Sequence, residues 1–180
     1  MNAPIRYVER AFPELESKEA FDLYWTGLPW VDRGAPRREC FVATKPVDYT
    51  YGASAYARTY SSDPIPEFMK SFWKAAEEFA GNEFELCFCN GYVDEKNHLG
   101  WHADDSDSVD DNRPILVVSI GAVRDIYFRD NERTFIDKLT LGNASGLLMG
   151  AGMQDTHEHK IPKHSAPCGP RVSFTFRGLV

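Results

Sequence analysis

Residues 84–92, FELCFCNGY, alternate between two sets of side chains. Successive side chains of an extended strand point to opposite faces, so every second residue shares a face. The stretch therefore predicts a β-strand and marks the point where helical periodicity gives way to a period of two. One face would carry Phe84, Leu86, Phe88, Asn90 and Tyr92, and the other Cys87, Cys89 and Gly91.

Similar patterns recur further along the chain, separated by Asp, Asn and Gly residues typical of turns. They cover residues 114–121, 125–129, 143–149 and 171–177. Many short strands after a helical start predict an α+β, mainly β fold, a sandwich or barrel of the jelly-roll kind with helices buttressing one side. A parallel Rossmann sheet is disfavoured, because it would need helices between these strands.

The N-terminal part predicts two helices. Residues 17–26 carry apolar side chains at helical spacing. The second helix would have Asp63 as its cap, prolines in its first turn and Gly81 as its stop. Between them, residues 33–66 show no helical period and predict short strands and loops.

Length and composition favour one globular domain over residues 1–180. With 43% hydrophobic and 26% charged residues, the chain can bury a core. The longest uncharged apolar run, residues 115–123, is far shorter than the ~20 residues of a membrane span. No apolar signal segment precedes Glu9 and Arg10, and the four cysteines form no CxxC pair. We therefore expect a cytoplasmic protein with reduced thiols and no membrane contact.

The net charge of −7 argues against a surface coated with phosphate-binding charge. The charge is unevenly spread, however. Residues 94–111 hold seven acids and one lysine, whereas residues 157–180 hold four basic residues and one acid. A small local patch for an anionic partner thus remains compatible with the total.

The densest set of possible metal ligands is the pair His102 and Asp104, followed by His157, His159 and His164. Residues two apart on an extended segment point to the same side and can reach one ion. Two imidazoles and one carboxylate form the facial triad of non-haem Fe(II) oxygenases. By itself, a His-x-Asp pair also occurs by chance in many proteins.

The last predicted strand places Arg171, Ser173, Thr175 and Arg177 on one face. Two arginines on a buried strand need anionic partners, because an unpaired buried charge is costly. A dicarboxylate lying along the strand would supply them, since arginine binds carboxylates through two parallel hydrogen bonds. The alternative is that these arginines pair with the protein's own acids or lie at the surface.

Taken in order, these motifs resemble the AlkB family of Fe(II)- and 2-oxoglutarate-dependent dioxygenases. The resemblance rests on Asn90-x-Tyr92, His102-x-Asp104, the run 159–163 (HKIPK) and the run 170–177 (PRVSFTFR). A weaker likeness upstream, over Pro36-Arg37, Tyr51-Gly52, Tyr60-Ser61 and Pro64-x-Pro66, suggests that family's nucleotide-recognition lid. The family implies a double-stranded β-helix, with a lid over approximately residues 30–66 and a catalytic core over residues 83–180.

The resemblance also implies roles for individual residues. His102, Asp104 and His159 would hold Fe(II), with 2-oxoglutarate and O2 as cosubstrates. His157 has the same parity as His159 and is the alternative register, whereas His164 would be a loop residue. Arg171, helped by Tyr92, would bind the distal carboxylate of 2-oxoglutarate, and Arg177 and Asn90 would lie toward its iron-chelating end. Ser173 would also contact the cosubstrate, although many members have Asn there.

For the substrate, the resemblance implies a methylated base flipped out of its stack. Tyr60, with Tyr56 and Tyr51 as further candidates, would stack on the base opposite His102. Arg37 would belong to the lid, and Asp105 would contact a cationic base such as 1-methyladenine or 3-methylcytosine. The alternatives are that the tyrosines pack the lid against the core and that Asp105 is a solvated loop acid.

We therefore expect a monomeric oxidative demethylase of N-alkylated bases in DNA or RNA, which releases formaldehyde, succinate and CO2. A second hypothesis keeps this chemistry for a hydroxylase that makes a modified base or acts on a non-lesion substrate, since a fold and oxidant do not determine the target. A third hypothesis is a non-catalytic nucleic-acid-binding jelly roll. It predicts that at least one metal ligand or one of the two arginines has been replaced, but the sequence retains all of them.

Overall fold

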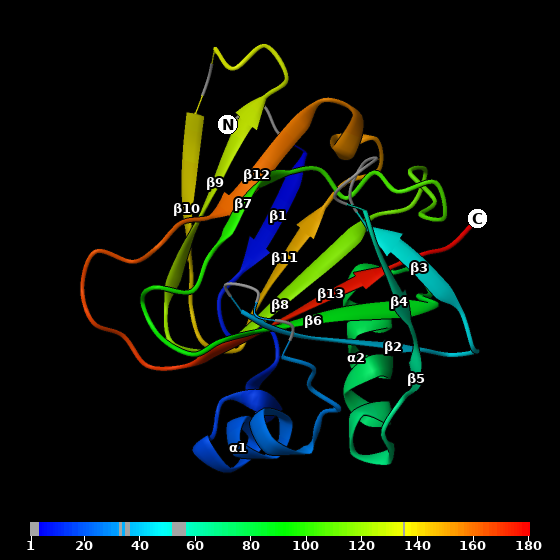
Figure 1. Cartoon of the computed structure of the whole chain (residues 1–180), viewed down its shortest axis with the longest axis vertical. Coiled ribbons are helices and arrows are strands. Elements are labelled where there is room, and N and C mark those ends of the chain that lie inside the picture. Colours follow the sequence, from blue (N-terminus) through cyan, green and yellow to red (C-terminus); the bar gives the residue numbers. More distant parts are fainter. Residues whose placement is uncertain (1–3, 33, 35–36, 52–56, 135) are drawn as a thin grey trace.

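The computed structural model describes residues 4–32, 34, 37–51, 57–134 and 136–180. The alternating stretch near residue 84 forms strand β6 (Leu86–Tyr92), an inner strand of a seven-stranded sheet. Figure 1 shows this sheet between two helices and a second, four-stranded sheet. The expected mainly β, jelly-roll fold is confirmed.

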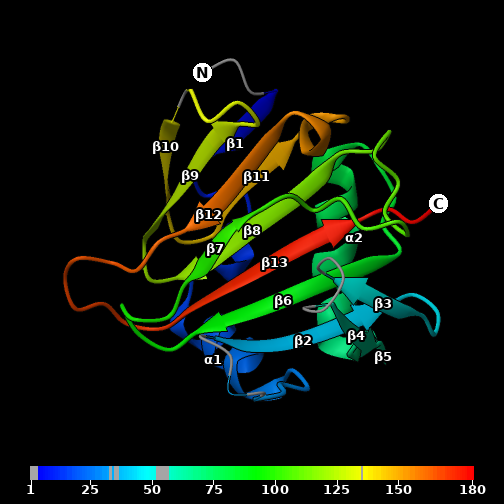
Figure 2. The same cartoon turned by 45° about the horizontal axis from the view of Figure 1, so that its top comes forward.

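The seven-stranded sheet has the order β1 (Ile5–Val8), β11 (Ser145–Met149), β8 (Ile115–Gly121), β13 (Arg171–Arg177), β6, β2 (Arg38–Ala43) and β5 (Asp63–Pro64). The four-stranded sheet has the order β10 (Ile136–Leu141), β9 (Arg124–Asp130), β12 (His157–Ile161) and β7 (Leu99–His102). A separate hairpin joins β3 (Asp48–Tyr51) and β4 (Arg58–Ser61), which lie near β2 in Figure 2. Among the described residues, short 3-10 turns cover Pro13–Leu15, Glu67–Met69 and Met153–Asp155.

Helix α1 (Lys18–Gly27) begins where the sequence predicts. The Ser17 hydroxyl accepts a hydrogen bond from the Ala20 N–H at 3.1 Å and so caps the helix. Helix α2 (Lys70–Ala80) also ends as expected, at Gly81, whose φ of 63° lies in the left-handed region that favours glycine.

The predicted start of α2 is wrong. Asp63 does not cap a helix but forms β5 with Pro64, parallel to Val42 and Ala43 of β2. Proline is tolerated there because β5 is an edge strand, where a missing N–H breaks no ladder bond. The helix therefore starts several residues later, after the 3-10 turn Glu67–Met69.

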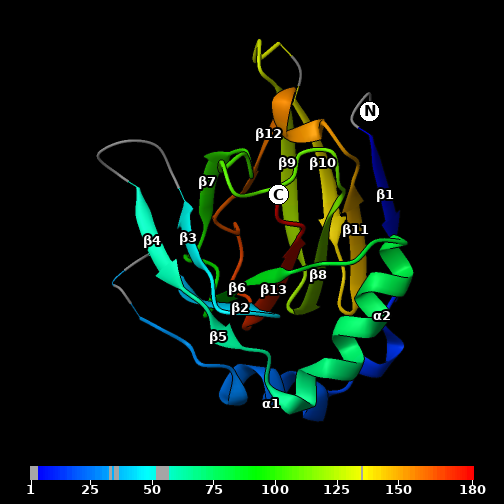
Figure 3. The same cartoon turned by 90° about the vertical axis from the view of Figure 1, so that its right-hand side faces the viewer.

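The helices cover the outer face of the seven-stranded sheet, as Figure 3 shows. From β13, Phe174 reaches into this layer, with its ring centroid 5.0 Å from that of Phe72 and 5.1 Å from that of Tyr24. Three cysteines, Cys40, Cys87 and Cys89, are buried in the same layer, and all four cysteines are free thiols as expected. The opposite face of β13 therefore faces the space between the two sheets.

Replacing Phe174 with alanine should lower the free energy of unfolding by ~3–5 kcal/mol, because a fully buried ring would leave a cavity. Leu23→Ala, on the exposed side of α1, should change it by less than about 1 kcal/mol. Urea unfolding followed by far-UV circular dichroism measures both. Similar losses in the two variants would contradict the assigned core.

Candidate metal and cosubstrate site

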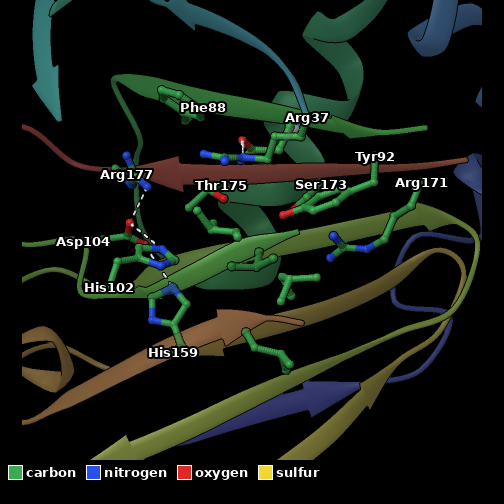
Figure 4. A pocket seen from close by; sticks show the side chains of 15 residues that line it. Arg37, Phe88, Tyr92, His102, Asp104, His159, Arg171, Ser173, Thr175 and Arg177 are labelled. Atoms are coloured by element: carbon green, nitrogen blue, oxygen red, sulfur yellow. Dashed lines mark hydrogen bonds and ion pairs between the residues drawn. The ribbon is translucent and has the colours of Figure 1, made fainter. Parts of the chain in front are cut away.

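Three possible metal ligands converge between the two main sheets, as Figure 4 shows. His102 ends β7, Asp104 follows two residues later, and His159 lies in the middle of β12. One ligand atom of each lies within 4.8 Å of the others. Asp104 Oδ1 is 3.6 Å from His102 Nε2, and its Oδ2 is 3.6 Å from His159 Nε2. This donor set and spacing fit a three-ligand face for Fe(II).

An irregularity in strand pairing shapes this face. His159 lies opposite His102, whereas Ile161 lies opposite Leu99, so β7 has one more residue than β12 between the two pairs. An extra residue shifts the alternation of side chains within a strand. Leu99 and His102 both line the cavity as a result, although strict alternation would have placed them on opposite faces.

The two histidines are in the protonation state that a metal requires. His102 Nδ1 lies 2.8 Å from the carbonyl oxygen of Gly100. A carbonyl can only accept, so Nδ1 carries the hydrogen and the lone pair of Nε2 is free to bind a metal. Burial lowers the pKa of His102, and burial is also the main cause that lowers the pKa of His159 to about 3. Both rings are therefore neutral at physiological pH.

Asp104 is held as an anion by its neighbours. Burial raises its pKa, but the positive charge of Arg177 outweighs burial and leaves that pKa below its usual value. Arg177 Nη2 donates to Asp104 Oδ1 at 2.6 Å. The Asp104 N–H donates to Gln154 Oε1 at 2.9 Å, which fixes the backbone between the two ligands on this segment.

The two other candidate histidines, His157 and His164, lie elsewhere. His157 begins β12 with Nδ1 2.8 Å from the Thr156 hydroxyl, and it does not line the cavity. His164 lies in the loop after β12, as expected, and its N–H donates to the carbonyl oxygen of Glu95 at 2.9 Å. Of the downstream histidines, the structure thus brings His159 next to His102 and Asp104.

A cavity of about 470 Å³, its mouth included, extends from these ligands along β13. Arg171, Ser173, Thr175 and Arg177 all line it, so the face predicted from the alternation is confirmed. Asn90 and Tyr92 of β6 line the neighbouring wall, opposite Ser173 and Arg171 in the strand register. The cavity therefore connects the ligand cluster at one end with Arg171 at the other (Figure 4).

Arg171 fits a carboxylate that comes from outside the protein. Its side chain is fully buried, and only Nη2 has a hydrogen-bond partner in the described part of the chain, the Ser119 hydroxyl at 2.8 Å. The guanidinium carbon lies 5.0 Å from the centroid of the Tyr92 ring. Burial lowers the pKa of Arg171, so the folded protein stabilises its charge less well than water does. A carboxylate bound at one of the free donors would correct this deficit.

Arg177, in contrast, has partners within the protein. Besides Asp104 it binds the hydroxyl oxygen of Tyr49, to which Nη1 donates at 2.8 Å. Pairing with the protein's own acids therefore holds for Arg177, whereas no acid among the described residues pairs with Arg171.

The structure corrects the expectation that Tyr60 offers an open stacking surface. Tyr60 pairs with Tyr49 across the β3–β4 hairpin, and both side chains point inward. Tyr60 is 4% exposed, packs edge-on against Phe88 and donates its hydroxyl hydrogen to Glu39 at 2.8 Å. The alternative, that this tyrosine packs the lid against the core, is the one observed. The Tyr51 side chain and all of Tyr56 lie outside the described residues.

The remaining two substrate candidates lie in different surroundings. Arg37 lines the cavity, where its Nε donates to Asn90 Oδ1 at 2.6 Å. Asp105 is exposed and does not line the cavity. Only the arginine thus faces the space in which a base could meet the metal ligands.

Several residues of the site escaped sequence reasoning. Tyr49 and Ser119 each hold an arginine side chain in place from a distant segment, Gln154 holds the backbone of Asp104, and no local motif marks these three. Arg124 could have been found, because it shares the alternating face of Ile126 and Phe128. Its donors bind the carbonyl oxygens of Asp94, Asn97 and Pro162, which ties together the loops at the Arg171 end.

The geometry agrees with comparisons to known protein families. The model of the 2OG-Fe(II) oxygenase superfamily matches residues 24–177, and the chain belongs to this superfamily. The solved structure of OsALKBH1 superposes with a TM-score of 0.69 over 99% of this chain and 98% of its own, at 16% identity, which shows the fold.

Two curated relatives show to which family within this superfamily the chain belongs. Alpha-ketoglutarate-dependent dioxygenase alkB homolog 3 of Mus musculus is 29% identical over 165 residues, covering 83% of this chain and 57% of its own length. DNA oxidative demethylase ALKBH2 of Homo sapiens is 27% identical over 188 residues, covering 96% of this chain and 69% of its own. Within the superfamily, the chain is a member of the AlkB family. The expected Fe(II), 2-oxoglutarate and O2 are the cofactors of this family.

The chain spans less than two thirds of the length of the mouse relative. Among its described helices, none is long and apolar enough to cross a membrane. The expectations of a monomer and a cytoplasmic location stay predictions.

Proposed function

We propose that this chain is an Fe(II)- and 2-oxoglutarate-dependent dioxygenase that removes N-methyl groups from bases of DNA or RNA. The main support for the proposal is that one cavity contains both a buried His-Asp-His cluster and Arg171, whose Nε and Nη1 donors have no partner among the described residues. The name of the human relative, DNA oxidative demethylase, supports the choice of substrate.

Each group along the cavity has a task in this proposal. His102, Asp104 and His159 would hold Fe(II), and Arg171 would bind the distal carboxylate of 2-oxoglutarate beside Tyr92. Asn90, Ser173 and Arg177 would orient the end of the cosubstrate that approaches the metal, as their positions on β6 and β13 allow.

The bound metal and cosubstrate would supply the oxidation of an unreactive C–H bond. In that reaction one oxygen atom of O2 would end in succinate as CO2 leaves, and the other would end in a hydroxyl group on the methyl carbon. The C–N bond of the hydroxymethyl group would then break and formaldehyde would leave. The proton of the hydroxyl group would pass to the ring nitrogen of a neutral base, or to solvent when the base is cationic. Buried apolar side chains on the cavity wall, Val117, Ile126 and Ile161, would keep water from this reaction.

Short oligonucleotides carrying one methylated base, single- or double-stranded and of DNA or RNA, test the proposal. With Fe(II), ascorbate and 2-oxoglutarate, mass spectrometry should detect loss of 14 Da from at least one of them, roughly the mass of a CH₂ group, together with formaldehyde. Succinate formation without demethylation of any of these oligonucleotides would contradict the proposed demethylase activity and favour the alternative hydroxylase.

A further inference from the structure

Arg37 is held at the cavity wall by two partners. Its Nε donates to Asn90 Oδ1 at 2.6 Å, and its Nη2 lies 3.1 Å from Glu39 Oε1. Only 9% of its side chain is exposed. Figure 4 shows the guanidinium reaching into the same space as Arg177 and Asp104. Arginine presents donors in a fixed plane and no acceptor, so this wall offers hydrogen-bond donors to whatever enters.

The acid that balances Arg37 stands behind it. Glu39 is 3% exposed, accepts a hydrogen bond from the Tyr60 hydroxyl at 2.8 Å, and does not line the cavity. The pair therefore turns its positive end to the cavity and its negative end to the core. The inward Tyr60 fixes this orientation, because its hydroxyl holds the second carboxylate oxygen of Glu39.

The charged side chains that line the described cavity are three arginines, Arg37, Arg171 and Arg177, and one acid, Asp104. Asp104 is already engaged by Arg177 and belongs to the proposed metal ligands. Asp105, the other candidate for neutralising a cationic base, is exposed outside the cavity. No acidic side chain of the described cavity lining is thus left over for a positively charged base.

We propose that Arg37 is a specificity-determining residue that selects neutral N-methylated bases with a carbonyl oxygen beside the methylated nitrogen over cationic ones. This inference rests on the proposed function and names its substrate class. 3-Methylthymine and 1-methylguanine are neutral and would offer the carbonyl oxygen as acceptor to the guanidinium. 1-Methyladenine and 3-methylcytosine carry a positive charge, so both would place charge against charge. 1-Methyladenine also offers no carbonyl oxygen, whereas 3-methylcytosine keeps one beside its methylated nitrogen, so discrimination against 3-methylcytosine rests on its charge.

The test compares single-stranded oligonucleotides carrying 3-methylthymine or 3-methylcytosine in the same sequence. We expect the wild-type protein to have the higher kcat/KM for 3-methylthymine. Arg37→Gln should lower the ratio of the two kcat/KM values at least about tenfold, the effect of one charge-assisted hydrogen bond in an enclosed site. Arg37→Lys keeps the charge but not the planar fork, so it should still disfavour 3-methylcytosine while losing turnover of 3-methylthymine.

Arg133→Gln serves as the matched control, because it removes the same charge from an exposed turn between β9 and β10. Its ratio should equal that of the wild type. Thermal unfolding of each variant establishes that it is folded before its kinetics are compared.

The outcomes separate this inference from the proposed function. Demethylation with a preference for 3-methylcytosine that Arg37→Gln leaves unchanged would overturn the inference and leave the proposed function standing. A raised 2-oxoglutarate requirement with an unchanged base ratio would also overturn it, since Arg37 would then serve the cosubstrate. Succinate formation without demethylation of any base would remove the proposed function and the inference with it.

Discussion

Replacing His159 with alanine should reduce Fe(II)-dependent succinate formation to the level of a metal-free control. His159 supplies one of the three ligand atoms that lie within 4.8 Å of one another, and two ligands hold a divalent ion poorly. The loss should exceed the roughly 10–100-fold that removal of an outer partner of a ligand costs in metal sites. Anaerobic titration with Fe(II), followed by equilibrium dialysis, measures the affinity separately from turnover.

His157→Ala is the matched control for this variant. The two histidines lie two residues apart on β12, but only His159 is paired with His102 in the strand register and lines the cavity. His157→Ala should therefore keep both its metal affinity and its turnover. If turnover persisted in His159→Ala and disappeared in His157→Ala, the assigned register of β12 would be wrong.

Replacing Arg171 with methionine should raise the 2-oxoglutarate concentration for half-maximal turnover at least about thirtyfold, equivalent to ~2 kcal/mol. Truncating one partner of a buried charge pair costs this much or more, and the donors of Arg171 would have no substitute in an apolar side chain. Steady-state kinetics at saturating methylated oligonucleotide measures the change. Arg171→Lys should give an intermediate value, since it keeps the charge without the two parallel donors.

Although Arg171→Met should weaken 2-oxoglutarate binding, we do not expect it to destabilise the fold. Without 2-oxoglutarate, the buried guanidinium of the wild type has free donors, so methionine should leave the free energy of unfolding equal or higher. Added 2-oxoglutarate should raise the melting temperature of the wild type and not that of Arg171→Met. Equal ligand-induced shifts in the two proteins would show that the cosubstrate binds elsewhere.

The two lid tyrosines link the β3–β4 hairpin to the arginines of the cavity. Tyr49 accepts from Arg177, and Tyr60 donates to Glu39, which in turn pairs with Arg37. Because Tyr49 and Tyr60 lie opposite each other in the hairpin, one small sheet positions both arginines. The hairpin therefore contributes to the cavity through its buried face.

Local sequence determined the parts of this protein that depend on periodicity. The alternation in residues 84–92 and 171–177 set which side chains of β6 and β13 face the cavity, because a strand turns successive residues to opposite sides. The spacing of His102 and Asp104 likewise brought two ligands to one point. Local alternation could not reveal the start of α2, because Asp63 pairs with Val42 in a parallel bridge.

Only the tertiary structure decided the partners of the charged side chains. Arg177 meets Asp104 from 73 residues away, Arg37 meets Asn90 from 53 residues away, and no short-range pattern encodes such pairs. The choice between His157 and His159 and the inward turn of Tyr60 depend on the register of β12 with β7 and of β3 with β4. Strand register is settled when whole sheets pack, because a slip of one residue would turn every side chain of a strand to the other face.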